Sequence, residues 1–312
     1  MRIVITAVAA LLSAGPAGGT LAAQDQAGRA GLASGSQKRT PAARVEWTQR
    51  TPDGQPDLQG TWVNFDATPF EAPAPASGGT ANNPGVGPPD HWTNHDSPNS
   101  PRRGAMVVEP ADGRVPVLSW AEARRDYDLD HLSDSWVHET PWVRCITRGV
   151  PGGMFPAAYN NGYRILQTPG FVVIVYEMLH ESRIIPLDGR PHVGRHIRLW
   201  NGDPRGHWDG NTLVVETTNY NDKGSIATSA ATGRIRGIPQ SEALHVTERF
   251  TRVDAKTINY EVTIDDPNVY AKPWKVALPL NQDPDYQIYE YACHEGNYAI
   301  PNELSSGRAH DK

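Results

Sequence analysis

The sequence predicts a mainly β protein: an antiparallel up-and-down barrel of the lipocalin or calycin type, or a two-sheet sandwich, with one N-terminal helix and a long proline-rich wrap. From residue 163 onward, short β-rich segments follow one another, tight turns separate them, and no helical period intervenes. Sequential antiparallel pairing is therefore the simplest topology. A sheet of about nine strands leaves exposed edges unless it closes or stacks, so we favour the barrel over the sandwich.

The first residues have the layout of a secretory signal peptide. Arg2 precedes a short apolar run at residues 3–12, and small residues follow up to Ala23. The run is shorter than the ~20 apolar residues of a membrane-spanning helix, and no later segment reaches that length. We expect residues 1–23 to be a signal peptide, the protein to be periplasmic or secreted, and no insertion into a membrane.

The rest of the chain divides by composition. Residues 24–50 are small, polar and unpatterned, which predicts a flexible linker. Residues 51–312 are expected to form a single β-barrel domain. Within it, residues 69–116 contain ten prolines and predict an irregular flap, because proline interrupts helices and sheet interiors.

The segments that follow the flap are one helix and then strands. Residues 119–133 predict the helix, with Ser119 as its N-cap and Glu122 completing a capping box. The connection WNGDPRGHWDGN is interpreted as turn-rich. The expected strands are YRILQT, FVVIVYEML, SRIIPL, HIRLW, NTLVVETTNY, LHVTERFTRV, TINYEVTI, WKVALPL and YQIYEYACHE.

The two cysteines, Cys145 and Cys293, predict a disulfide if the protein is exported, because an even pair in an oxidising compartment is most simply bridged. Such a bond would close a long loop and stabilise the fold by about 5 kcal/mol in the chain-entropy model. Two separate buried thiols are the alternative.

Composition excludes several classes of function. The net charge of −6 with mixed signs predicts no nucleic-acid binding. No Gly-x-Ser-x-Gly elbow, phosphate-binding loop or dinucleotide fingerprint occurs, and GVPGG at residues 149–153 is interpreted as a loop. We expect no cofactor and a small-molecule ligand, either a glycoside or an aromatic compound, and the oligomeric state stays open.

Strand alternation directs several glutamates towards the interior. Each has the parity of apolar residues in its segment, although the strand of Glu216 is apolar on both faces. Buried carboxylates need partners, and titratable groups in a pocket favour acid–base chemistry. One β-bulge would reverse the parity. The glutamates are Glu177, Glu216, Glu248 and Glu290.

The candidate catalytic group is expected at the mouth of a hairpin. Glu177 would orient the His180 imidazole, and Arg183 would stabilise anionic charge, with help from His192 and Glu248. The hypothesis is a metal-independent hydrolase or lyase that acts on an oxygen-rich small molecule, such as a glycoside, in a polar barrel pocket. The alternative for the trio is a solvated, salt-bridged hairpin end.

Other residues are candidates for binding. Aromatic faces beside polar side chains suit a sugar, and the candidates are Trp200, Asp203, Arg205, Trp208, Glu216, Tyr289 and Glu290. Strand geometry separates residues i and i+4 by roughly 13 Å, which argues against a metal. A divalent ion would have to use His180, His192, His196 or His207. The alternatives to an enzyme are a non-catalytic lipocalin-like periplasmic ligand-binding protein and a His-rich metalloprotein.

Two resemblances support the fold. Gly60, Thr61 and Trp62 resemble the Gly-x-Trp start of lipocalin-like barrels. The stretches PDLQGTW, DGRPH, WDGNTLVVET, LHVTERFTRVD and YEYACHEGNY resemble a group of uncharacterised exported bacterial β-barrel proteins. The second resemblance covers most of the chain and implies export and a barrel, but no activity.

Overall fold

The computed structural model describes residues 47–64, 68–73, 104–157 and 159–310. The chain divides into the units Met1–Ala43 and Arg44–Lys312. The first unit lies outside the described residues. So do the predicted signal peptide, nearly all of the predicted linker, and residues 74–103 of the predicted flap.

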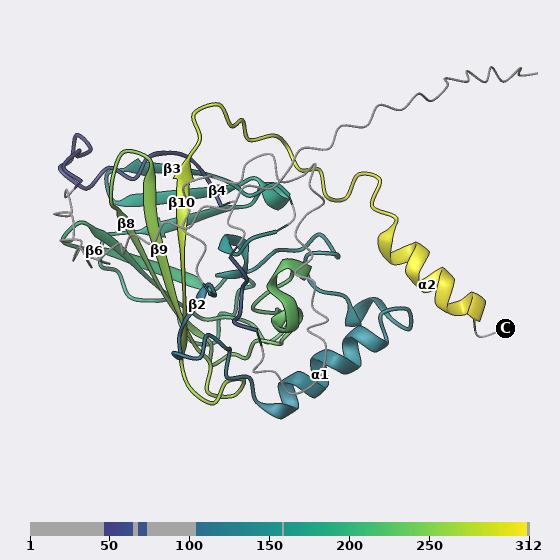
Figure 1. Ribbon diagram of the computed structural model, residues 1–312. Coiled ribbons are helices and arrows are strands. Elements are labelled where there is room, and N and C mark those ends of the chain that lie inside the picture. Colours follow the sequence, from purple (N-terminus) through teal and green to yellow (C-terminus); the bar gives the residue numbers. More distant parts are fainter. Residues whose placement is uncertain (1–46, 65–67, 74–103, 158, 311–312) are drawn as a thin grey trace, which may run out of the picture. The chain divides into compact units, whose positions relative to one another are not determined.

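Nine antiparallel strands form a nearly closed barrel, and a tenth joins its wall (Figure 1). The hydrogen-bonded order is β5-β4-β3-β1-β10-β9-β8-β7-β6, with β2 paired to β10. The edge strands β5 and β6 lie next to each other without a ladder, so the seam of the barrel falls there. The prediction of a mainly β, antiparallel barrel is confirmed. The strands are β1 (Gly60–Val63), β2 (Val107–Glu109), β3 (Gly162–Thr168), β4 (Phe171–Tyr176), β5 (Ser182–Pro186), β6 (Asp203–Asp209), β7 (Thr212–Thr218), β8 (His245–Arg252), β9 (Thr257–Asp265) and β10 (Trp274–Gln282).

The two ends of the barrel differ in their connections. Residues 110–161 and 219–244 leave and re-enter at one end, which we call the loop end. Short turns, such as those at residues 169–170 and 210–211, join strands at the opposite end, which we call the turn end. Binding and catalytic residues lie most often on connecting segments held by a rigid scaffold. A site is therefore expected at the loop end, where the connections are long.

The barrel interior is filled by side chains. Along β9, alternate residues such as Ile258, Tyr260 and Ile264 are completely inaccessible, as expected when every second residue of a strand faces inward. Trp62 of β1 and Trp274 of β10 are buried with them. Each such side chain contributes about 1.5–3 kcal/mol by leaving water. The interior is therefore a packed core with one polar cluster.

Arg252 lies at the turn end and contacts two separate segments of the chain there. Its guanidinium lies 4.0 Å from the ring centroid of Trp47 and 4.9 Å from that of Trp62. Its N–H groups donate to backbone carbonyls, among them those of Asp57 at 3.0 Å and Ala255 at 2.8 Å. One cation therefore ties the segment before β1 to the turn after β8.

The described ends of the proline-rich segment pair with each other. Met106 N donates to the Pro69 carbonyl at 2.8 Å, and Val107 N donates to that of Phe70 at 3.0 Å. The Phe70 ring packs edge-on against Phe155, with centroids 4.9 Å apart. Through β2, this segment joins the barrel wall beside β10.

The helices differ in part from the prediction. The predicted helix is α1 (Ser119–Asp130), but its N-cap is Leu118, whose extended backbone is fixed by a hydrogen bond to the Val269 carbonyl. The C-terminal helix α2 (Ala299–His310) was not predicted. Short 3-10 turns are η2 (Trp136–His138), η3 (Gly152–Met154), η4 (Met178–His180) and η5 (Ala230–Ile235).

Two predicted strands are absent from the described residues, and one was missed. HIRLW, residues 196–200, contributes only a bridge from Leu199 to Tyr220. Residues 286–295 are irregular, because β9, β1 and β2 already occupy the edges of β10. Conversely, β6 lies in the segment predicted to be a turn-rich connection, where it pairs with β7 across its whole length.

Candidate functional site

A glycine-rich turn covers the loop end of the barrel. A Cβ atom added to Gly153 would lie 3.1 Å from the Tyr176 ring, and one added to Gly152 would lie 2.9 Å from the Ile226 carbonyl oxygen. Only glycine allows such close approach. The Tyr163 hydroxyl donates to the Gly153 carbonyl at 3.1 Å, and burial raises the pKa of this phenol to about 12, which keeps it a donor.

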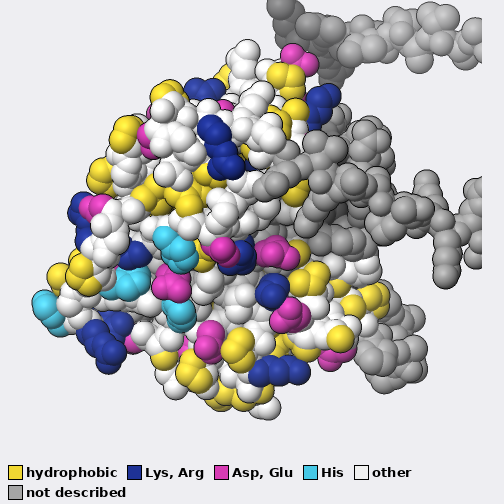
Figure 2. All heavy atoms as spheres, turned by 90° about the vertical axis from the view of Figure 1, so that its left-hand side faces the viewer, with side chains coloured by type: hydrophobic (Ala, Val, Ile, Leu, Met, Phe, Trp, Pro, Cys, Tyr) yellow, Lys and Arg dark blue, Asp and Glu magenta, His cyan; other side chains and the backbone are white. Residues whose placement is uncertain are grey.

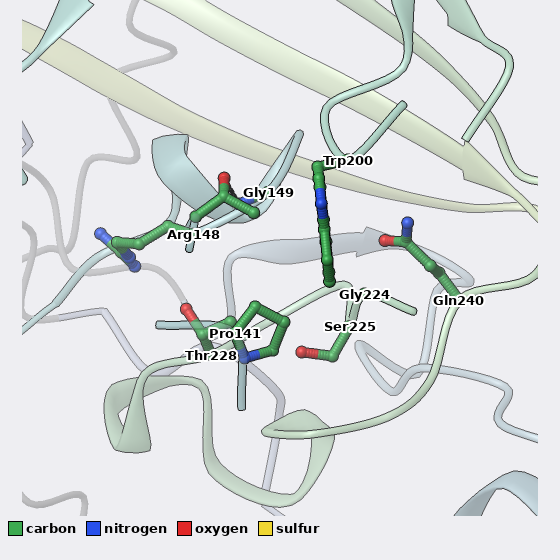
Figure 3. A pocket seen from close by; sticks show the side chains of 9 residues that line it. Pro141, Arg148, Gly149, Trp200, Gly224, Ser225, Thr228 and Gln240 are labelled. Atoms are coloured by element: carbon green, nitrogen blue, oxygen red, sulfur yellow. Dashed lines mark hydrogen bonds between the residues drawn. The ribbon is translucent and has the colours of Figure 1, made fainter. Parts of the chain in front are cut away.

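A small pocket, which we call the Trp200 pocket, lies beside this turn. The empty space between its walls, including solvent at its mouth, is about 170 Å³, and none of it admits a water-sized sphere. Figure 3 shows the Trp200 ring edge-on between Gln240 on one side and Arg148 and Gly149 on the other, with the Arg148 guanidinium extending away from the ring. The wall thus joins an aromatic surface to hydroxyl and amide groups. The lining residues are Pro141, Thr147, Arg148, Gly149, Trp200, Gly224, Ser225, Thr228 and Gln240.

The polar groups of the pocket differ in how they are satisfied. Gln240 Nε2 donates to the Asn221 carbonyl at 2.9 Å, which fixes its amide. Thr228 Oγ1 is buried and has no hydrogen-bond partner among the described residues. A buried hydroxyl without a partner costs about 1–3 kcal/mol. Thr228 is therefore the group in this wall with most to gain from a hydrogen-bonding ligand.

A carboxylate lies behind the pocket. Glu181 Oε2 accepts from Thr147 Oγ1 at 3.0 Å, and its Oε1 accepts from Asn201 Nδ2 at 3.0 Å. Thr147 Oγ1 is also 2.9 Å from Asn201 Oδ1, so its one proton is shared between two acceptors. This network fixes Thr147 and the residue next to Trp200, and so holds two parts of the pocket wall.

Arg148 is a buried cation without an ion-pair partner among the described residues. Its side chain is 2% exposed. Nη2 donates to the Phe155 carbonyl at 3.0 Å, whereas Nε and Nη1 have no partner in the described part of the chain. The guanidinium carbon lies 5.5 Å from the Trp142 ring centroid. Burial lowers the pKa of Arg148, and the nearby Tyr163 and Glu181 oppose this effect.

A second polar group lies inside the barrel. Arg183 of β5 forms an ion pair with Glu248 of β8, and its Nη2 also donates to Thr217 Oγ1 at 2.8 Å. The Tyr260 hydroxyl donates to Glu248 Oε1 at 3.0 Å. Burial lowers the pKa of the Arg183 guanidinium, but Glu248, together with Tyr176 and Tyr220, outweighs burial and raises it. Burial, and then Glu248, also raises the pKa of Tyr260, so this phenol stays neutral beside the ion pair.

The predicted catalytic trio does not come together. Glu177 is buried as predicted, but its Oε2 accepts from the Tyr286 hydroxyl at 2.5 Å and from Gly162 N at 3.2 Å. His180 is exposed, and its Nδ1 donates to the Tyr291 carbonyl at 2.7 Å. Because β4 ends before Glu177 and η4 intervenes, the hairpin mouth separates the three side chains that alternation had grouped.

The two assisting residues also have different surroundings. Glu248 lies inward as predicted, in the ion pair with Arg183. His192 lies elsewhere, with its Nδ1 3.1 Å from Asp203 Oδ2. Of the five predicted catalytic side chains, Arg183 and Glu248 contact each other. The side chains of Glu177, His180 and His192 each bond to a different partner outside this set.

The predicted binding residues fall into three groups. Trp200 lines the pocket. Asp203 accepts from Arg205 Nη1 at 2.7 Å, outside the pocket wall, and Trp208 packs against the core. The inward parity predicted for Glu290 is wrong, because this residue is not in a strand. Glu216, whose parity the sequence left open, faces outward on β7. The exposed members are Glu216, Tyr289 and Glu290.

The histidines that the structure describes do not form a cluster with other ligand side chains. Within the described ranges, no three His, Cys, Asp or Glu side chains are placed to hold a metal ion. His196 and His207 are exposed. Figure 2 shows histidines interspersed with acidic and basic side chains on the face that it presents. Such a surface provides mixed charge without a defined coordination site.

A second hollow lies at the turn end, between the segment before β1 and the β3–β4 turn. It is an open groove of about 870 Å³. Its wall contains one carboxylate, that of Asp53, and no aromatic ring. The Trp200 pocket is the better candidate because it is less open and is lined by an indole. The groove is lined by Thr51, Pro52, Asp53, Gln59, Gln167, Thr168 and Pro169.

The disulfide is as predicted. Cys145 and Cys293 are bonded across a sequence separation of 148 residues. The bond holds the irregular segment after β10 against the loop end, where Tyr291 lies with Trp142. No helix in the described part of the chain is long and apolar enough to cross a bilayer.

Sequence reasoning missed most of the pocket wall. Thr228 and Gln240 come from a connection without regular strands, and nothing in their neighbourhood marks them. Arg148 precedes GVPGG, whose paired glycines were a signal for close backbone approach, although the segment was interpreted only as a loop.

The chain matches no family model, no curated protein and no solved structure. Fold and site together define a filled antiparallel β-barrel that carries a small pocket of mixed aromatic and polar character at its loop end.

Proposed function

We propose that this protein binds a small oxygen-rich molecule, such as a sugar or one residue of a glycoside, in the Trp200 pocket. The observation that carries the proposal is the combination of an indole surface with the Thr228 hydroxyl and Gln240 amide in one enclosed wall. Sugars offer C–H faces that pack on indole and hydroxyls that need such donors and acceptors.

The pocket favours a small ligand. As its side chains stand, it admits no water-sized sphere, so a ligand would have to displace part of the wall to enter. A single sugar ring, or the end of a longer chain, requires the smallest displacement. The proposal differs from a lipocalin-like carrier in position, because the ligand lies at the loop end and not within the filled barrel.

The proposed setting is the periplasm or the exterior of the cell. The signal-like N-terminus and the disulfide between Cys145 and Cys293 both support it. The ligand would then be one that occurs outside the cytoplasm.

The test is a binding screen of the full chain with free monosaccharides and nitrophenyl glycosides, followed by tryptophan fluorescence and calorimetry. We expect Trp200→Ala to weaken binding at least about tenfold, because an aromatic contact contributes on the order of 1.5 kcal/mol. Thr228→Val, which keeps the shape but removes the hydroxyl, should weaken it by roughly 5- to 30-fold.

The matched control is Trp120→Ala, which removes an exposed tryptophan from α1, away from the pocket. It should bind like the unmodified protein. Equal affinities for the Trp200→Ala and Trp120→Ala variants would contradict the proposal, and so would the absence of binding to every member of the panel.

The second candidate function is the one that the sequence favoured, acid–base hydrolysis or lysis of a glycoside without a metal. The observation in its favour is the contact between two of the predicted catalytic residues, Arg183 and Glu248, beside the Tyr260 hydroxyl. The same nitrophenyl glycosides test it, because hydrolysis releases a coloured product. Activity that survives in a folded Glu248→Gln variant would remove this candidate.

A further inference from the structure

The C-terminal helix α2 has one face turned towards the rest of the domain. Most of its described side chains are exposed. The half-buried ones have the spacing i, i+3, i+4 and i+7. These positions lie on one side of a helix. The inner face consists of Ile300, Glu303, Leu304 and Gly307.

The inner face contacts the segment that follows α1. A Cβ atom on Gly307 would lie 2.7 Å from the Ser133 carbonyl oxygen, so the helix and this segment are in close contact. One turn earlier, the carboxyl of Glu303 is hydrogen-bonded to that of Glu139. Two carboxyl groups can form such a bond only when one of them carries a proton.

Glu139 is poorly placed for a charge. Its side chain is 6% exposed, and its Oε2 has no partner among the described residues. The charged groups that face it are Glu303 of α2 and Arg236, which follows η5. Burial, followed by the contact with Glu303, raises the pKa of Glu139 to about 7, and the attraction of Arg236 only partly opposes this.

We propose that α2 is a pH-sensitive latch, held on the domain by the hydrogen bond between protonated Glu139 and Glu303 and released when Glu139 loses its proton. Two ionised carboxylates at hydrogen-bond distance repel each other, and partial burial strengthens the repulsion. Arg236 belongs to the domain, so it stabilises ionised Glu139 without holding α2. Neither Ile300 nor Leu304 belongs to, or packs against, the buried apolar clusters of the described residues, which leaves the carboxyl pair to decide docking.

The release would stay local. The disulfide at Cys293 keeps the preceding segment on the loop end, so only the residues beyond it can move away. Glu139 lies two residues before Pro141 in the pocket wall, and Arg236 lies in the segment that supplies Thr228 and Gln240. The latch is thus next to the Trp200 pocket, but it requires no ligand and stands independently of the proposed function.

The test is hydrogen exchange of the full chain at about pH 5.5 and about pH 8.5, with rates corrected for the intrinsic pH dependence of exchange. We expect the protection of residues 299–310 to fall by roughly tenfold or more at the higher pH, since each pKa unit corresponds to a tenfold change in protonation. Trypsin cleavage after Arg308 should accelerate over the same range.

In Glu303→Gln the amide can accept from protonated Glu139 or donate to its carboxylate, so α2 should stay protected at both pH values. Glu139→Gln should behave in the same way. The matched control, Glu290→Gln, removes an exposed carboxylate from the same C-terminal region and should retain the pH dependence.

Three results would each overturn the latch. The first is equal protection of α2 at both pH values in the unmodified protein. The second is a Glu303→Gln variant that loses protection with pH as the unmodified protein does. The third is a helix that stays unprotected in both glutamine variants at every pH while the barrel remains folded.

Discussion

Arg183 and Glu248 form an ion pair across the seam of the barrel. Arg183 lies on β5, and Glu248 lies on β8, two strands beyond the edge strand β6. Because no backbone ladder joins β5 to β6, this side-chain contact, together with the bond to Thr217 on β7, links the two halves of the wall from inside.

The first prediction concerns this pair. Glu248→Gln leaves the Arg183 charge buried without its carboxylate, and we expect the free energy of unfolding in urea to fall by about 3–5 kcal/mol. The matched control is Arg249→Gln, which breaks the exposed pair of Arg249 with Asp209 one residue further along β8. It should cost less than about 1 kcal/mol.

A similar loss in both variants would show that the seam does not depend on the buried pair. The double replacement of Arg183 by Met and Glu248 by Leu provides a second measurement. It removes both charges together and should recover much of the stability lost in Glu248→Gln.

The second prediction is the pH dependence of stability that Glu139 introduces. Its pKa is raised from 4.5 to about 7 in the folded state, so the folded protein binds this proton more tightly than the unfolded chain does. The stabilisation is complete below about pH 4.5 and is lost as the pH rises through 7. Glu139→Gln should lack this loss.

The measurement is chemical denaturation of both proteins at several pH values between 5 and 8. The difference in unfolding free energy between Glu139→Gln and the unmodified protein should increase in favour of the variant as the pH rises. A constant difference would contradict the raised pKa.

The third prediction concerns the turn end. Arg252→Met keeps the apolar stem but removes the hydrogen bonds to the Asp57 and Ala255 carbonyls and the charge between Trp47 and Trp62. We expect a loss of about 2–4 kcal/mol in thermal or urea unfolding. The matched control is Arg164→Met, which removes an exposed arginine of β3 whose hydrogen bond to Thr61 Oγ1 is long, at 3.4 Å. It should leave the free energy of unfolding nearly unchanged.

The fourth prediction is for the disulfide. Replacing Cys145 and Cys293 with serine removes a cross-link between residues 148 apart, which the chain-entropy model values at about 5 kcal/mol. The urea midpoint of the variant should match that of the reduced protein and lie well below that of the oxidised one. Equal midpoints for oxidised and variant proteins would show that the bond adds no stability.

The strands were largely predictable because their signal is local. Turns such as DGN at residues 209–211 and alternating apolar residues in β8 and β9 are contained within short windows of sequence. The inward position of Glu248 followed from the same alternation. Failure came where a segment with strand-like composition followed a strand whose two edges were already paired, as at residues 286–295 after β10.

The pocket could not be predicted for a different reason. Its wall combines Pro141, Trp200 and Gln240, which come from separate connections that meet only after the barrel has closed. No spacing rule joins such residues. For the same reason, Glu177 was correctly placed inside, but its partner Tyr286, more than a hundred residues later, was not foreseen.

The position of β1 has a consequence for the order of folding. Most ladders join strands that are neighbours in sequence, so their hairpins can form as soon as both strands have been synthesised. β1 is different, since it lies between β3 and β10 and therefore pairs with the last strand of the barrel. One edge of β1 therefore stays unpaired until β10 has been synthesised. In a nascent chain without β10, this free edge is open to pairing with other chains.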